Sequence, residues 1–149
     1  MKIVIGSDHG GYELKAGLVE FLKKEKYDTE DLGTHSKDSC DYPLIGFEVA
    51  RAVSDRKADR GVLICRTGIG MAIIANKLPG VRAGVVQSVE MAKSSREHND
   101  CNILVLAADY TESSLAKKIL KVWLETENLG ERHARRVGQI KKLESKSRK

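Results

Sequence analysis

Short apolar runs alternate along the chain with longer segments in which apolar residues recur every three or four positions. Continuous apolar runs are typical of strands that are buried on both faces of a sheet, and the longer spacing is typical of helices. The runs predict strands at residues 2–6, 27–32, 62–64, 81–86 and 103–107. The spaced segments predict helices at residues 12–26, 43–56, 71–77, 88–97, 110–126 and 131–147. This regular alternation predicts an α/β fold with a parallel sheet that helices cover on both faces.

The length and composition narrow the class of protein. A chain of 149 residues with 41% hydrophobic and 32% charged residues suits one soluble domain spanning residues 1–149. The amino terminus enters strand-like sequence without a signal-peptide pattern and no long apolar run follows, so we expect a cytoplasmic protein without a membrane partner. The three cysteines, an odd number without C-x-x-C spacing, argue against a disulfide framework and a metal site.

Positive charge is concentrated at the carboxyl end of the chain. The net charge is +5, and residues 131–149 contain eight basic and two acidic residues, so this segment is predicted to be a basic helix or tail. Such a segment binds nucleic acid, or it is a solvated helix with a few arginines directed at a phosphorylated ligand. Interleaved aromatic residues, which stack on single-stranded bases, are missing from it, so we expect no nucleic-acid partner.

The strongest candidate for chemistry is the segment Gly61–Met71, in which an apolar run is followed by a glycine-rich loop. Cys65 stands at the carboxyl end of the predicted third strand. Ligands of open α/β sheets bind at that edge, and the N–H groups of the following helix favour negative charge. A thiol in this place is a candidate base or nucleophile, although a lone cysteine is also a common packing residue. The segment Gly68–Gly70 does not suit a dinucleotide fingerprint, which belongs after the first strand.

Further polar residues stand at strand or helix ends. Asp8 and His9 follow the first strand and therefore share an edge with Cys65, although the pair also suits a helix cap. Tyr42 is placed either to line a pocket or to pack. The segment 98–100, His-Asn-Asp, precedes the fifth strand and is either a functional polar cluster or a simple helix cap.

Two arginines of the basic segment have a spacing suited to an anion. Arg132 and Arg136 are four positions apart and share a helix face, which suits the binding of one phosphate group. Ion pairs on a solvated helix produce the same pattern, so the spacing leaves both interpretations open.

Six motifs, in order along nearly the whole chain, resemble type B ribose-5-phosphate isomerase, whose family also contains the galactose-6-phosphate isomerase subunits. They are Ser7-Asp8-His9-Gly10-Gly11-Tyr12-Glu13-Leu14-Lys15, Asp41-Tyr42-Pro43, Cys65-x-Thr67-Gly68-Ile69-Gly70, Ala75-Asn76-Lys77, Arg96-Glu97-His98-Asn99-Asp100 and Gly130-x-Arg132-His133-x-x-Arg136. The resemblance implies a three-layer α/β/α Rossmann-like fold with strand order 2-1-3-5-4. It also implies a homodimer, sometimes a dimer of dimers, whose active sites are shared between subunits and use neither metal nor organic cofactor.

The resemblance also implies a reaction and a role for each motif. The expected substrates are ribose 5-phosphate and ribulose 5-phosphate, which interconvert through an enediolate, with Cys65 as the base and Thr67 assisting at the sugar hydroxyls. The implied donors to the enediolate oxygen are the backbone N–H groups of Gly68, Ile69, Gly70 and Met71. His98 matches the residue that opens the sugar ring. The residues implied to hold sugar oxygens are Asp8 and Asn99, and those implied to clamp the phosphate are His9, Arg132 and Arg136.

Two positions depart from the family pattern. Arg66 follows Cys65 where the family usually has glycine, and Asp109 stands in a segment where the family often has an arginine that reaches the substrate. Our hypothesis is that Arg66 replaces the missing cation; the alternative is that it points to solvent or pairs with Asp109. The departures leave open a hexose 6-phosphate isomerase, acting on allose or galactose 6-phosphate, and a sugar-phosphate-binding protein without catalysis.

Overall fold

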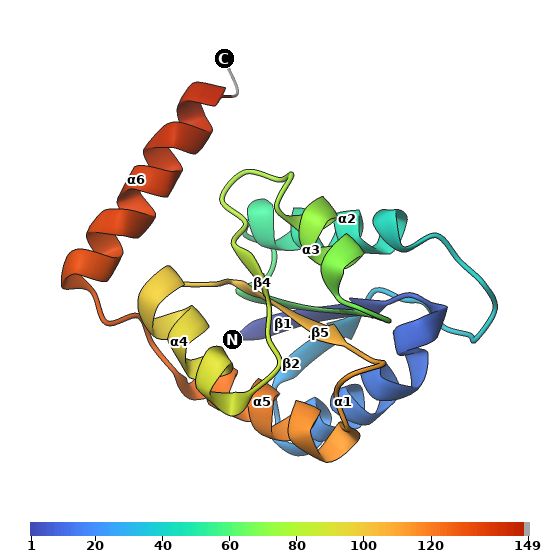
Figure 1. Ribbon diagram of the computed structural model, residues 1–149. Helices are drawn as coiled ribbons and strands as arrows, with labels where there is room; N and C mark the ends of the chain where they lie inside the picture. The colour runs from blue at the N-terminus through green and yellow to red at the C-terminus, as the bar shows by residue number, and fades with distance from the viewer. Residues whose placement is uncertain (148–149) are drawn as a thin grey trace.

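Five parallel strands form one sheet in the computed structural model, which describes residues 1–147 (Figure 1). The strands are β1 (Lys2–Ser7), β2 (Asp28–Asp31), β3 (Arg60–Cys65), β4 (Ala83–Val85) and β5 (Ile103–Ala107). Their order in the sheet is β2-β1-β3-β5-β4, and every neighbouring pair is parallel. The strand order and the parallel α/β architecture predicted above are confirmed.

Helices cover both faces of the sheet. The helices are α1 (Tyr12–Lys24), α2 (Tyr42–Ser54), α3 (Ile69–Ala75), α4 (Val89–Asn99), α5 (Ser113–Glu125) and α6 (Glu131–Ser147), and a short 3₁₀ turn, η1, spans His9–Gly11. The helices α1, α4 and α5 lie on one face, and α2 and α3 lie on the other (Figure 1). None of the described helices is both long enough and apolar enough to cross a membrane.

The alternation of side chains along β3 divides the core into two layers. Val62 and Ile64 belong to the cluster beneath α1, α4 and α5, whereas Leu63 and Cys65 belong to the cluster beneath α2 and α3. Successive side chains of a strand point to opposite faces, so this division follows from the strand itself. The Cys65 side chain therefore faces the α2 and α3 layer.

Two helix boundaries differ from the predicted ones in ways that affect the site. Helix α3 begins at Ile69, earlier than predicted, because Gly68 caps it in the left-handed conformation with φ of 75°. Helix α4 continues to Asn99, so His98 and Asn99 lie within the helix and not in the loop after it. Asp100 ends that helix at φ of 48°, and its carboxylate accepts a hydrogen bond from Arg96 Nη1 at 2.9 Å. The helix thus extends two residues beyond the end that the sequence pattern predicts.

Helix α6 leaves the body of the protein at an angle and contacts it mainly through α4 (Figure 1). Its first half buries His133 and Val137, whereas Ile140 and Leu143 farther along are 50% and 65% exposed. The basic residues Arg148 and Lys149 lie outside the described residues. The outer part of α6 therefore presents apolar side chains that the described chain does not cover.

Candidate active site

The loop after β3 bends back over the Cys65 thiol. Cys65 is 5% exposed, and the backbone N–H of Gly68 donates a hydrogen bond to its Sγ over 3.2 Å. Gly68 has a positive φ that other residues rarely adopt, and a Cβ there would lie 3.2 Å from Val85 Cγ1. The loop conformation in which this N–H donates to the sulfur therefore requires glycine at position 68.

The first turn of α3 provides further donors beside the thiol. The Ile69 N–H donates to Thr67 Oγ1 at 3.3 Å, and the first intrahelical bond runs from Ala72 N–H to the Gly68 carbonyl. The N–H groups of Gly70 and Met71 lie before that bond and have no helical acceptor, as at the start of any helix. Four amides are implied as donors to the enediolate. The amides of Gly68 and Ile69 are engaged within the loop, so those of Gly70 and Met71 remain available to a bound anion.

A cavity of about 440 Å³ opens beside the thiol at the carboxyl edge of the sheet. Its volume lies in the range of small-molecule sites. Its walls bring together most of the residues predicted for the pocket, namely Asp8, His9, Tyr42, Cys65, Arg66, Thr67, Ile69 and Gly70, and Ile73 joins them. Within residues 1–147, no group of three or more His, Cys, Asp or Glu side chains is arranged to hold a metal ion.

Asp8 and His9 enter the cavity from the end of β1. Asp8 is 7% exposed, and its carboxylate accepts the Gly11 N–H at 3.1 Å. The residue therefore both caps η1 and lines the cavity. His9 Nδ1 accepts the backbone N–H of Cys40 at 3.2 Å. This bond assigns the proton of the neutral ring to Nε2, which can donate to an anion.

The loop that carries Cys40 is fastened by a buried lysine that the sequence pattern does not reveal. Lys15 is 1% exposed, and its Nζ donates to Asp31 Oδ1 at 2.6 Å and to the Thr34 carbonyl at 2.6 Å. A lysine on an amphipathic helix is ordinarily solvated, so only the fold identifies this role. Through the loop, Lys15 supports the backbone group that orients His9.

Tyr42, at the start of α2, both packs and lines the cavity. A Cβ placed on Gly70 would lie 2.6 Å from two carbon atoms of the Tyr42 ring, so the ring lies directly on the glycine. Both interpretations of Tyr42 therefore apply. The contact also gives a reason for glycine at position 70 that does not depend on its φ.

A second group of predicted residues lies at the other end of the sheet. Helix α4 leads into β5, so its carboxyl end, with His98 and Asn99, lies at the amino-terminal edge of the strands (Figure 1). The beginning of α6, with Arg132 and Arg136, packs against α4. None of these four residues lines the cavity around Cys65. Within the described chain, the predicted site residues therefore form two separate groups, one around Cys65 and one at the junction of α4 and α6.

Within this second group, two histidines stack. The rings of His98 and His133 are 4.4 Å apart between centroids and 10° from parallel. Burial lowers the pKa of His133, and the adjacent His98 lowers it further, with Arg132 and Arg136 contributing in the same direction. These effects favour the neutral form of His133, whose ring stacks on the more exposed ring of His98.

Arg66 and Asp109 lie together at the rim of the cavity. Arg66 Nη1 is 3.4 Å from Asp109 Oδ1, and their side chains are 62% and 43% exposed. The Arg66 side chain lies over Gly10, where a Cβ would be 2.6 Å from Arg66 Cγ. Arg66 thus forms the ion pair given above as the alternative, while it also lines the cavity. A long, exposed ion pair contributes little to stability, so the pair leaves the guanidinium available to a ligand.

The fold and the cavity define a class of protein: a parallel α/β protein with a candidate ligand site beside a thiol at the carboxyl edge of the strands. Comparison of the sequence with known proteins identifies a family within this class. The chain belongs to the ribose/galactose isomerase family, whose sequence profile matches residues 3–140.

Individual members of the family are similar over almost their whole length. Ribose-5-phosphate isomerase B of Escherichia coli strain K12 is 40% identical over 145 residues, which are 97% of each chain. The structure of ribose-5-phosphate isomerase B from Clostridium thermocellum is 52% identical, with a TM-score of 0.97 and 99% of each chain covered. The enzyme of Mycoplasma genitalium with bound ribulose-5-phosphate is 38% identical, with a TM-score of 0.94 over 97% of this chain and 96% of that one.

Proposed function

We propose that this protein interconverts ribose 5-phosphate and ribulose 5-phosphate. The observation that carries the proposal is the Cys65 thiol beside a cavity lined by amide, carboxylate and imidazole groups. It is supported by the relatives named for this activity and by the one solved with ribulose-5-phosphate bound. An aldose and its ketose differ in the positions of one carbon-bound proton and one hydroxyl proton. A base that moves the first, beside an anion-stabilising loop and side chains that bind the hydroxyl groups, meets this chemical need.

In this mechanism the Cys65 thiolate removes the proton from C2 of the open-chain aldose and delivers it to C1. The hydroxyl proton on the C2 oxygen passes to the C1 oxygen, assisted by Thr67, so that C2 becomes the carbonyl carbon. The electron pair of the broken C–H bond forms the enediolate, whose oxygen receives hydrogen bonds from the Gly70 and Met71 amides. A preorganised donor of this kind contributes roughly 3 to 4 kcal/mol to transition-state stabilisation. Thr67 and Asp8 hold the sugar hydroxyls, and the Nε2 proton of His9 donates to the phosphate.

The remaining residues come from a second copy of the chain. We propose a homodimer in which His98, Asn99, Arg132 and Arg136 of one subunit complete the cavity around Cys65 of the other. In support, apolar side chains next to the cavity are exposed, with Ile69 at 60% and Ile73 at 57%. A second apolar surface is the groove of about 1150 Å³ beside α6, whose lining includes Met91, Ile140 and Leu143.

Burial of both apolar surfaces in an isologous dimer gives each subunit the same two contacts. Within each subunit the stacked ring of His133 supports His98 as it opens the furanose ring. The two arginines, one turn apart on α6, clamp the phosphate and thereby orient the reacting carbons.

The proposed reaction is tested by direct turnover. Purified protein is expected to convert ribose 5-phosphate to ribulose 5-phosphate, and NMR of the sugar mixture measures both species at equilibrium. Allose 6-phosphate and galactose 6-phosphate are compared under the same conditions. Turnover of a hexose phosphate alone would transfer the mechanism to the longer sugar, whereas ligand-dependent thermal stabilisation without any product would show a binding protein that lacks catalysis.

Arg66 is proposed to bind the substrate from the rim of the cavity. Arg66→Gly is expected to raise KM for ribose 5-phosphate about tenfold with little change in kcat, because a hydrogen bond to a charged group is worth about 1.5 to 3 kcal/mol. Steady-state kinetics on the variant measure both constants.

The control for this prediction is Asp109→Asn, which removes the ion-pair partner and leaves Arg66 in place. If the only role of Arg66 is its ion pair with Asp109, both variants will give the same kinetics. Unchanged KM and kcat in Arg66→Gly would refute its role in substrate binding.

A further inference from the structure

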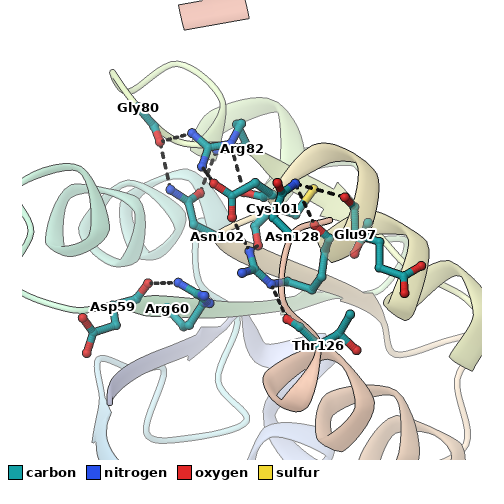
Figure 2. A network of polar contacts seen from close by, with 12 residues as sticks. Asp59, Arg60, Gly80, Arg82, Glu97, Cys101, Asn102, Thr126 and Asn128 are labelled. Atoms are coloured by element: carbon teal, nitrogen blue, oxygen red, sulfur yellow. Dashed lines mark hydrogen bonds and ion pairs between the residues drawn. The ribbon is translucent and has the colours of Figure 1, made fainter. Parts of the chain in front are cut away.

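Three arginines, Arg60, Arg82 and Arg96, lie near one another at the amino-terminal end of the sheet, and two of them pair with one carboxylate (Figure 2 labels Arg60 and Arg82). Arg82 Nη2 lies 2.8 Å from Asp100 Oδ2, and Arg96 Nη1 lies 2.9 Å from Asp100 Oδ1. Asp100 therefore forms ion pairs with two guanidinium groups. Among the described residues no ion pair reaches the third arginine, Arg60, so positive charge is in excess at this place.

Arg60 is the group with unused hydrogen-bonding capacity. Its Nη1 donates to the Asp59 carbonyl at 2.9 Å, but its Nε is buried and has no hydrogen-bond partner among the described residues. The guanidinium lies 6.0 Å from the ring centroid of Trp123. Burial lowers the pKa of Arg60, and the nearby Arg96 lowers it further. A partly buried cation in this state is stabilised by any anion that reaches it.

A cavity of about 610 Å³ lies against these groups. The charged groups that line it are Arg56, Asp59, Arg60, Arg82, Asp100 and Lys141. Four cations thus face two carboxylates, and one of these, Asp100, is shared with Arg96 behind it. The Asp59 carboxylate accepts the Lys2 backbone N–H at 2.7 Å.

Two groups around this cavity also bear on what it binds. At its rim, the Gly80 N–H donates to the Glu144 carboxylate at 3.0 Å. The Asn102 side chain, which also lines the cavity, donates to the Gly80 carbonyl at 2.8 Å and accepts the Arg82 N–H at 2.8 Å. These bonds hold the wall of the cavity rigid. The volume exceeds that of one phosphate group, so an organic substituent on the phosphate has room.

We propose that this cavity is a second anion-binding site, which takes a phosphate-bearing small molecule on Arg60 and Arg82, with Arg56 and Lys141 at its entrance. Arg82 also donates to the Asp100 and Gly80 carbonyls, which fixes the direction of its guanidinium group. A dianion at this place balances the excess positive charge, and phosphate oxygens are strong acceptors for guanidinium donors. The site is at the opposite edge of the sheet from Cys65 and does not depend on the proposed isomerase reaction.

The test is a titration of the isotope-labelled full chain with inorganic phosphate, followed by amide NMR at constant ionic strength. Constant ionic strength separates binding from screening of surface charge. Two sets of shifts are expected, one around His9 in the Cys65 cavity and one around Arg60 and Asn102. Shifts confined to the Cys65 cavity would overturn the proposal.

Variants assign the second set of shifts to this cavity. Arg56→Asn combined with Lys141→Ala removes two exposed cations at the entrance, and asparagine tolerates the φ of 60° at position 56. This double variant is expected to weaken the phosphate binding reported by the shifts around Arg60 about tenfold, because exposed charges each contribute modestly. The shifts in the Cys65 cavity are expected to remain unchanged. Lys23→Ala with Lys118→Ala removes equal charge elsewhere and is expected to change neither set. Equal weakening in both double variants would show a general charge effect and reject the site.

Discussion

Replacement of Cys65 by alanine is expected to lower kcat for the ribose 5-phosphate reaction by about 10²- to 10⁴-fold, the usual contribution of a positioned general base. KM is expected to change little, because Thr67, Asp8 and His9 remain in place to bind the sugar phosphate. The measurement is steady-state turnover together with exchange of the substrate C2 hydrogen in D₂O. Exchange reports the proton-transfer step itself and is expected to disappear with turnover.

Two comparisons separate the base from the loop that surrounds it. Cys65→Ser retains an acceptor for the Gly68 N–H but is a far weaker base, so it is expected to resemble Cys65→Ala in rate. A ribose 5-phosphate binding curve matching that of the unmodified protein shows that the cavity is intact. Substantial C2 exchange in Cys65→Ala would assign the base to another residue and leave Cys65 as a packing residue.

A mixture of two inactive variants is expected to regain activity, the second large effect. Cys65→Ala and His98→Ala each damage a different half of the proposed shared site. In a hybrid isologous dimer one site carries both changes and the other carries neither. Random reassortment of equal amounts makes about half of the dimers hybrids, so about a quarter of the unmodified activity per subunit is expected to return. Turnover after subunit exchange, compared with each variant alone, measures the recovery.

The matched control mixes Cys65→Ala with Asp8→Ala. Both residues line the same cavity in one chain, so each site of that hybrid contains one damaged residue and no recovery is expected. Recovery in both mixtures, above the activity of each variant alone, would show that Asp8 and Cys65 act in different sites and would contradict their placement in one cavity. An absence of recovery in the His98 mixture, with hybrid dimers detected by native mass spectrometry, would contradict the shared site.

Local pattern was sufficient for most of the fold because each element is set by short-range periodicity. The apolar run before Cys65 predicts β3, and Gly68 predicts the break after it, since few other residues adopt its φ. Helix ends were less accurate. Helix α4 continues through His98 to Asn99 because Arg96 holds the Asp100 carboxylate, a side-chain contact that no periodicity shows.

The sequence by itself determined the alternation of strands and helices, the position of the thiol at a strand end and, through its motifs, the family. Only the tertiary structure decided which residues meet. It separates His98 from Cys65, because α4 must lead back to the amino-terminal edge to begin β5. It also pairs Arg66 with Asp109 and directs the Cys40 N–H to His9. These contacts join residues far apart in the chain, and their formation depends on how the whole sheet and its helices pack.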